Sequence, residues 1–328
     1  MLSRYWHSLE GVHVQCVLCP HLCRIAPGKR GRCNVRENQG GSLVVLNYGI
    51  ITGIALDPLE KKPLYHVKPG RQILSVGSVG CNLNCGFCQN YESVRGAWPT
   101  QSITPEGLVA LALDSKDRGN VGIAWTYSEP VMWYEFVQDS AALAKAQGLT
   151  TVLITNGFLE EEPWRELLKD IDAINLDLKG MRDDFYREQC GGKLEPVLRN
   201  LRIASELCHV EITTLLIEGC NTAPTELDLL FRTIGSIDPN IPLHLSRYRP
   251  AREFTLPATD PDLVRRAVRE GQKYLKFVYP GNLPESWSAV TCCPECQERL
   301  VERGYQVTVN LQAQACPRCK HRLNIIIQ

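Results

Sequence analysis

Short apolar runs alternate with helix-like segments through the middle of the chain. The apolar runs cover residues 73–79, 122–125, 151–155, 173–178, 210–217, 242–246 and, as a seventh candidate, 274–279. Between them, the helix-like segments cover residues 105–117, 131–147, 161–169, 194–207, 223–234 and 260–270. This alternation predicts an α/β fold built on a parallel sheet, either open or curled into a barrel.

Polar residues follow six of these predicted strands. In a parallel sheet the carboxyl ends of the strands meet on one side, where ligands bind. Taken singly, such residues are usually helix caps or turns, but six on one side of a sheet predict a site. In strand order they are Cys81, Glu129, Thr155 with Asn156, Asp177 with Lys179, Cys220 with Asn221, and His244.

Three cysteines follow the first predicted strand and are separated by three and then two residues. Cys81, Cys85 and Cys88 can close on one metal centre, to which they offer three thiolates. A tetrahedral structural zinc site needs a fourth protein ligand. An iron–sulfur cube held at three corners keeps one iron open for chemistry. The missing ligand therefore favours a cluster.

A second group of cysteines lies within the first 65 residues, where the apolar content is too low for an independent core. Its members fit a closed zinc site or a second iron–sulfur cluster, and both alternatives stay open. Residues 42–54 of this region read as a strand. The cysteines are Cys16, Cys19, Cys23 and Cys33.

The third group forms two Cys-x2-Cys pairs near residue 300, with a hairpin-like segment at residues 305–311 between them. Paired knuckles at this separation predict a zinc ribbon, in which the metal replaces the core that so short a segment lacks. Its ligands are Cys293, Cys296, Cys316 and Cys319. The chain therefore divides into a Cys-rich region at 1–65, a barrel at 66–285 and a zinc ribbon at 286–328.

Composition narrows the partners and the compartment. Lys+Arg and Asp+Glu both total 36 in 328 residues, so there is no global electrostatic case for nucleic acid or an anionic membrane. No membrane span or secretory signal is visible. Thiolates that must stay reduced to bind metal indicate a reducing cytoplasm. Residues 57–66 carry several charges between prolines, and by themselves predict a solvated turn.

Together these motifs resemble a known family. The spacing of Cys81, Cys85 and Cys88, with Phe87 before the last cysteine, resembles the signature of radical S-adenosylmethionine (SAM) enzymes. With the N-terminal cysteines, residues 57–66, residues 80–90 and the ribbon, the chain looks like the radical SAM component of the AmmeMemoRadiSam system. That branch is related to the activating enzymes of pyruvate formate-lyase type.

The resemblance implies a partial (β/α)6 TIM-like barrel in which Cys81, Cys85 and Cys88 hold a 4Fe-4S cluster that binds SAM. Tyr127 and Ser128 stand where the matching motif has two glycines before its glutamate. The residues implied to contact the cofactor are Phe87 at the adenine, Glu129 at the amino group, Thr155, Asn156, the pair Asp177 and Lys179, and His244 at the ribose.

The leading hypothesis is an enzyme that cleaves SAM reductively to a 5′-deoxyadenosyl radical and abstracts hydrogen from an unidentified substrate. Flavodoxin or ferredoxin is the expected electron donor. One alternative is a glycyl-radical activase acting on a partner protein, with other AmmeMemoRadiSam proteins as further candidate partners. The non-enzymatic alternative is a metal-stapled electron-transfer or binding protein. Cys220 is a weak candidate for quenching a radical, since a buried free cysteine is the commoner explanation.

Overall fold

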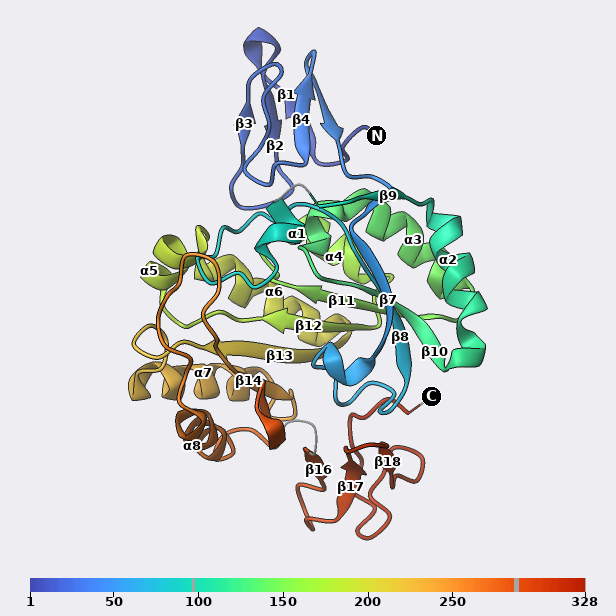
Figure 1. Ribbon diagram of the computed structural model, residues 1–328, viewed down its shortest axis with the longest axis vertical. Helices are drawn as coiled ribbons and strands as arrows, with labels where there is room; N and C mark the ends of the chain where they lie inside the picture. Colours follow the sequence, from blue (N-terminus) through green and yellow to red (C-terminus); the bar gives the residue numbers. More distant parts are fainter. Residues whose placement is uncertain (96–97, 286–288, 328) are drawn as a thin grey trace.

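An eight-stranded sheet forms the centre of the computed structural model, which describes residues 1–95, 98–285 and 289–327 (Figure 1). Its order is β15-β14-β13-β12-β11-β10-β8-β7. Strands β8 and β10 to β15 pair in parallel, whereas β7 is antiparallel to β8. The predicted parallel sheet is confirmed. The strands are β7 Gly53–Pro58, β8 Gln72–Gly77, β10 Asn120–Trp125, β11 Thr150–Thr155, β12 Ala173–Asp177, β13 His209–Leu216, β14 Leu243–Arg247 and β15 Val278–Gly281.

Helices cover the outside of the sheet between successive parallel strands (Figure 1). Their starts follow local chemistry: the Thr104 side chain caps one helix by accepting the Gly107 N–H, and Asp260 caps another. The segment predicted as one helix at 131–147 begins as a 3₁₀ turn, η4 Pro130–Trp133. The helices are α2 Pro105–Asp114, α3 Tyr134–Ala146, α4 Glu161–Leu168, α6 Leu194–Leu207, α7 Pro224–Ile237 and α8 Pro261–Gly271. This arrangement is consistent with the predicted partial barrel.

The segment at residues 57–66 is not the solvated turn that its charges predict. Leu59 and Leu64 are fully buried, and only 5% of Lys62 is exposed. The two leucines belong to one buried cluster with Ile73 and Ala124 of the sheet. The apolar residues between the charges therefore pack against the sheet, and the prediction was wrong because it weighed the charges alone.

Glu211 on β13 is the centre of a buried polar network that contains three histidines. Its carboxylate accepts the His66 backbone N–H at 2.7 Å and contacts Nε2 of His244 at 2.7 Å and of His209 at 3.3 Å. The His66 ring contacts the Tyr279 hydroxyl at 2.9 Å. Burial lowers the pKa of His66 from 6.5 to about 3.

Acid is expected to weaken the fold through His66. Below pH 6.5 His66 binds a proton in the unfolded chain but stays neutral in the folded protein. The contribution of His66 to folding stability is therefore full above pH 6.5 and is lost as the pH falls towards about 3. Between pH 7.5 and 5.5 the loss is about 1.4 kcal/mol. Denaturation curves at the two pH values test this. The His66→Gln variant should lose that part of the slope, and an unchanged slope would contradict the assignment.

The N-terminal region stands at one end of the barrel (Figure 1). It consists of a three-stranded antiparallel sheet and a hairpin: β1 Trp6–Ser8, β2 Val14–Cys16, β3 Arg24–Ile25, β4 Arg36–Gln39 and β5 Ser42–Val45.

The Arg36 guanidinium fixes this region to α3 through a buried ion pair. Its Nη1 and Nη2 atoms donate to the Glu135 carboxylate at 2.9 and 2.7 Å, and the two side chains are 1% and 0% exposed. The same carboxylate accepts the Arg4 backbone N–H at 3.0 Å. One acidic residue of the barrel therefore anchors both β4 and the start of the chain.

The single strand expected at residues 42–54 is broken into β5, β6 Ile50–Ile51 and the start of β7. Gly49 has a φ of +71°, and the Ile50 N–H donates to the Asn47 carbonyl at 3.0 Å to close a turn. Because β7 pairs with β8, the barrel sheet begins inside the region expected to be N-terminal.

The C-terminal region is a small antiparallel sheet of β16 Val290–Cys292, β17 Arg299–Glu302 and β18 Thr308–Val309. Its hairpin joins β17 to β18, so the segment predicted at 305–311 contains only the second strand. The predicted boundary at 285/286 borders residues 286–288, which lie outside the described residues. Across the described chain, no helix combines the length and apolarity needed to cross a membrane.

Candidate functional site

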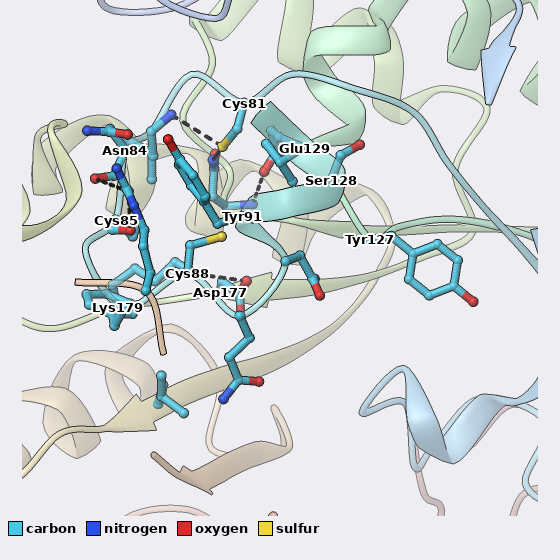
Figure 2. A pocket seen from close by; sticks show the side chains of 18 of the residues that line it. Cys81, Asn84, Cys85, Cys88, Tyr91, Tyr127, Ser128, Glu129, Asp177 and Lys179 are labelled. Atoms are coloured by element: carbon cyan, nitrogen blue, oxygen red, sulfur yellow. Dashed lines mark hydrogen bonds and ion pairs between the residues drawn. The ribbon is translucent and has the colours of Figure 1, made fainter. Parts of the chain in front are cut away.

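The loop after β8 brings Cys81, Cys85 and Cys88 to the carboxyl-terminal edge of the sheet. All three line one cavity of about 300 Å³, which Glu129, Asp177 and Lys179 also line (Figure 2). The Leu83 N–H points at the Cys81 sulfur at 3.4 Å. The structure therefore brings the predicted cluster ligands and three of the predicted SAM contacts together.

Two arginines fix the backbone of the cysteine loop. Arg95 donates to the carbonyls of Cys81 and Leu83 at 2.8 and 3.0 Å. Arg252 donates to the Cys85 carbonyl at 2.8 Å and lies 4.0 Å from the centre of the Tyr91 ring. These bonds hold the loop without using any of the three thiols.

Cys190 is a neighbour that sequence reasoning missed. It ends the π-helix η5 Tyr186–Cys190, and its carbonyl accepts the Asn84 N–H at 2.8 Å. Its fully buried thiol lies beside Cys85 and lowers the pKa of the Cys85 thiol. A lone cysteine far along the chain carries no signal of this contact, which depends on the fold alone.

Glu129 is a buried carboxylate that binds three protein donors. It accepts the Thr155 hydroxyl at 2.6 Å and the N–H groups of Asn156 and Val131 at 2.8 and 3.2 Å. Burial raises its pKa to about 7. Thr155 thus orients Glu129, whereas Asn156 also lines the cavity and donates to Asn82 at 3.0 Å.

Asp177 and Lys179 form an ion pair at 2.8 Å on the cavity wall. Burial opposes the charge on Lys179, but the Asp177 carboxylate and the Cys85 thiolate together outweigh it and hold the pKa of the lysine well above its usual range. Phe87 also lines the cavity, and its ring stacks on Phe185 with centroids 5.9 Å apart. These three predicted residues lie at the same site.

Tyr127 takes a backbone conformation that favours glycine. Its φ is +66°, which costs about 1–2 kcal/mol for a side chain with a Cβ. The hydroxyl donates to Asp57 at 2.7 Å, and the Lys62 ammonium lies 4.5 Å from the ring centre. In Figure 2 the ring points away from the cysteines. The loop therefore keeps the backbone conformation that favours glycine, while Asp57 and Lys62 hold the tyrosine side chain in place.

Two predicted residues lie elsewhere. His244 faces Glu211 and lines a second cavity of about 950 Å³. Cys220 is half-buried, and neither described cavity contacts it. The second cavity joins the first at shared wall residues, which are Pro63, Tyr127, Ser246 and Asn282.

The two remaining cysteine groups differ in their spacing. In the ribbon, Cys293 and Cys319 lie 3.6 Å apart, as do Cys296 and Cys316, and all four sulfurs lie within 4.8 Å of one another. The N-terminal group lines one small hollow and does not reach that spacing: Cys16, Cys19, Cys23 and Cys33.

The parallel sheet, the cysteine loop at its edge and the comparison with known proteins agree on one class. The profile described as "Radical SAM superfamily" matches residues 75–227. The chain therefore contains a radical SAM superfamily domain, which supports an enzyme. The family implies a 4Fe-4S cluster and SAM as cofactors. The predicted superfamily is confirmed, and the AmmeMemoRadiSam branch stays a prediction.

Over its whole length the chain is similar to the uncharacterized protein MJ0808 of Methanocaldococcus jannaschii, with 35% identity over 99% of both chains. Pyruvate formate-lyase-activating enzyme of Clostridium pasteurianum is 32% identical over 42% of this chain and 60% of its own length. Streptococcus suis SuiB bound to S-adenosylmethionine has a TM-score of 0.52 at 14% identity, covering 62% of this chain and 48% of SuiB. The SuiB likeness concerns the fold alone.

Proposed function

We propose that the protein cleaves SAM reductively at a 4Fe-4S cluster held by Cys81, Cys85 and Cys88, and abstracts hydrogen from a substrate. The observation that carries this proposal is the set of three thiols, a buried carboxylate and an ion pair on the wall of one cavity. When bound, the cofactors would supply one electron to the sulfonium and release methionine and a 5′-deoxyadenosyl radical.

The residues around the cavity fit SAM. Glu129 is buried, and among the described residues no ion pair joins it to a cation, so its carboxylate suits the SAM ammonium. The Lys179 ammonium suits the SAM carboxylate. Phe87 provides an apolar surface on the same wall for the adenine. These groups bind and orient the molecule, and the cysteines hold the metal.

We place the substrate in the second cavity, because it joins the first at Tyr127, Ser246 and Asn282. Its wall combines Lys61, Arg303 and other polar side chains. A small polar molecule, or a polar side chain of a protein, fits this chemistry. The substrate would then lie next to the SAM site without displacing the cofactor.

Anaerobic reconstitution tests the proposal. With dithionite and SAM, the protein should form 5′-deoxyadenosine and methionine in equal amounts. Its reduced electron paramagnetic resonance (EPR) signal should change on adding SAM. A sample with a full cluster that neither cleaves SAM nor changes its spectrum would overturn the proposal.

Removing the Lys179 charge is expected to weaken SAM binding. The Lys179→Gln variant should raise the Kd for SAM by roughly 10-fold to 100-fold, the loss expected for one charge-assisted hydrogen bond of about 1.5–3 kcal/mol. Titration of the EPR change with SAM measures this. Lys169→Gln is the control, because Lys169 lies on the surface beside Glu166. Equal affinity in the two variants would contradict the role of Lys179.

A glycyl-radical activase is the second candidate, supported by the similarity to pyruvate formate-lyase-activating enzymes. A glycyl radical signal on a co-incubated partner would favour it. We retain flavodoxin or ferredoxin as the proposed electron donor and AmmeMemoRadiSam proteins as proposed partners. Membership of an enzyme superfamily argues against the non-enzymatic alternative.

The ribbon cysteines are proposed to bind one structural zinc. A zinc–sulfur bond of about 2.3 Å in tetrahedral geometry places thiolates roughly 4 Å apart. The 3.6 Å separations in the ribbon match this spacing. Zinc analysis should find one ion that is lost in the Cys293→Ser variant.

A further inference from the structure

The N-terminal cysteines have the surroundings of metal-bound thiolates. All four cysteines line one small hollow, where Cys16, Cys19 and Cys33 are buried and Cys23 is half-buried. The Arg36 guanidinium lines the same hollow. The four cysteines are therefore arranged around one hollow in a way that would let them bind a metal centre together.

Their spacing excludes the geometry of the ribbon. Within the described residues, the ribbon is the one group in which three or more Cys, His, Asp or Glu ligand atoms all lie within 4.8 Å of one another. The sulfurs of the N-terminal four, and those of Cys81, Cys85 and Cys88, are farther apart than this. A zinc ion draws its thiolates together, whereas each sulfur on an iron–sulfur cube binds a different iron. The N-terminal group thus shares the wider spacing of the loop that the family assigns to a cluster.

Arg36 supplies a second, independent observation. Its guanidinium lines the same hollow, and its Nη atoms bind Glu135. Its Nε atom is buried and has no hydrogen-bond partner among the described residues. An orphaned buried donor costs about 1–3 kcal/mol. A cluster in the hollow would offer this N–H a sulfur acceptor.

The hollow is connected directly to the cysteine loop at the sheet edge. The His21 ring contacts the Asn82 carbonyl at 2.7 Å, next to Cys81. Arg95 bridges the two regions by donating to the carbonyls of Arg32 at 3.1 Å and Cys81 at 2.8 Å. A few bonds therefore separate the two cysteine groups.

We propose that Cys16, Cys19, Cys23 and Cys33 hold a second iron–sulfur cluster that relays electrons to the cluster at Cys81, Cys85 and Cys88. The relay rests on the proposed SAM cleavage, whereas the second site does not. One electron leaves a reductant of the flavodoxin or ferredoxin class and reduces the second cluster. Reoxidation of that cluster passes the same electron to the SAM cluster, where it is used to break the sulfonium C–S bond. Because SAM and substrate fill the cavity, the electron arrives through the protein.

Metal analysis of the reconstituted chain tests the site. The wild type should contain about eight irons and one zinc, and the Cys16→Ser/Cys19→Ser variant about four irons and one zinc. The Cys208→Ser control should keep about eight irons, because Cys208 lies outside the three groups. About four irons with two zincs in the wild type would overturn the second cluster.

Two reductants test the relay. With dithionite, which diffuses freely, the double variant should still form 5′-deoxyadenosine, and its EPR signal should still change with SAM. With reduced flavodoxin its rate should fall at least 10-fold. Equal rates in variant and wild type with flavodoxin would overturn the relay.

The Cys23→Ser variant provides a test if the double variant fails to fold. Cys23 is the half-buried member of the group, so the change is mild. It should alter the EPR signal or potential of one cluster and leave the SAM-responsive signal unchanged. A SAM-responsive signal that changes instead would overturn the assignment. A wild type with about eight irons whose spectra ignore SAM would sustain the second site and overturn the proposed function.

Discussion

A Cys81→Ala variant is expected to lose the cluster at the sheet edge together with SAM cleavage. Only three thiols of this loop face the cavity, so the loss of one leaves two ligands for the metal. Changes to residues behind metal ligands already cost 10-fold to 100-fold, so 5′-deoxyadenosine formation should fall by more than about 100-fold. Product quantification after dithionite reduction measures the rate, and iron analysis should show a loss of about four irons.

Cys208→Ala is the matched control, because its half-buried thiol lies outside the three cysteine groups and donates to the Ala204 carbonyl at 3.6 Å. It should keep its iron and its rate. Cys190→Ala is the more informative comparison: it removes the thiol beside Cys85 but none of the loop thiols. It should keep the irons and shift the reduction potential. If Cys81→Ala retained SAM cleavage, the proposed ligand set would be wrong.

A Glu135→Gln variant is expected to destabilise the protein by about 3–5 kcal/mol. Because both side chains are almost fully buried in the native fold, the change leaves the Arg36 guanidinium buried without its anionic partner. The melting temperature should fall by roughly 10 °C. Anaerobic thermal melts of the reconstituted protein measure the change.

The exposed pair of Arg232 and Asp228 provides the control. Its N–O distance of 2.7 Å equals that of the buried pair, but both side chains are largely exposed. Asp228→Asn should therefore change stability by less than about 1 kcal/mol. The double variant Arg36→Met/Glu135→Leu should recover most of the loss, since apolar residues can replace a buried ion pair. A Glu135→Gln variant as stable as Asp228→Asn would contradict the argument.

The parallel strands were predictable because each is buried on both faces and so reads as a continuous apolar run. The candidate site was predictable for a related reason: polar residues that follow buried strands in sequence gather at one edge in space. Cys85, Glu129 and Lys179 were found in this way, and the cavity unites them. The resemblance contributed their roles, which position alone does not supply.

Other features depend on contacts that no local pattern records. The Cys190 thiol reaches Cys85 only through the π-helix, and Arg36 meets Glu135 only once the hairpin packs on α3. The prediction for residues 57–66 was wrong because charged residues are exposed on average, whereas here the burial of Leu59 and Leu64 sets the position of the segment. Its charges are then satisfied locally, as in the bond of Lys62 to Asp57 at 2.9 Å.

The strained backbone at Tyr127 constrains how relatives of this chain can differ. Tyrosine is tolerated in this conformation while Asp57 accepts its hydroxyl and Lys62 lies over its ring. A relative with glycine at this position needs neither partner, and a relative that keeps the tyrosine needs both. The three positions should therefore change together across homologous sequences, although they lie on separate segments of the chain. The side chain also stands between the two cavities, so such a change would alter what passes from one to the other.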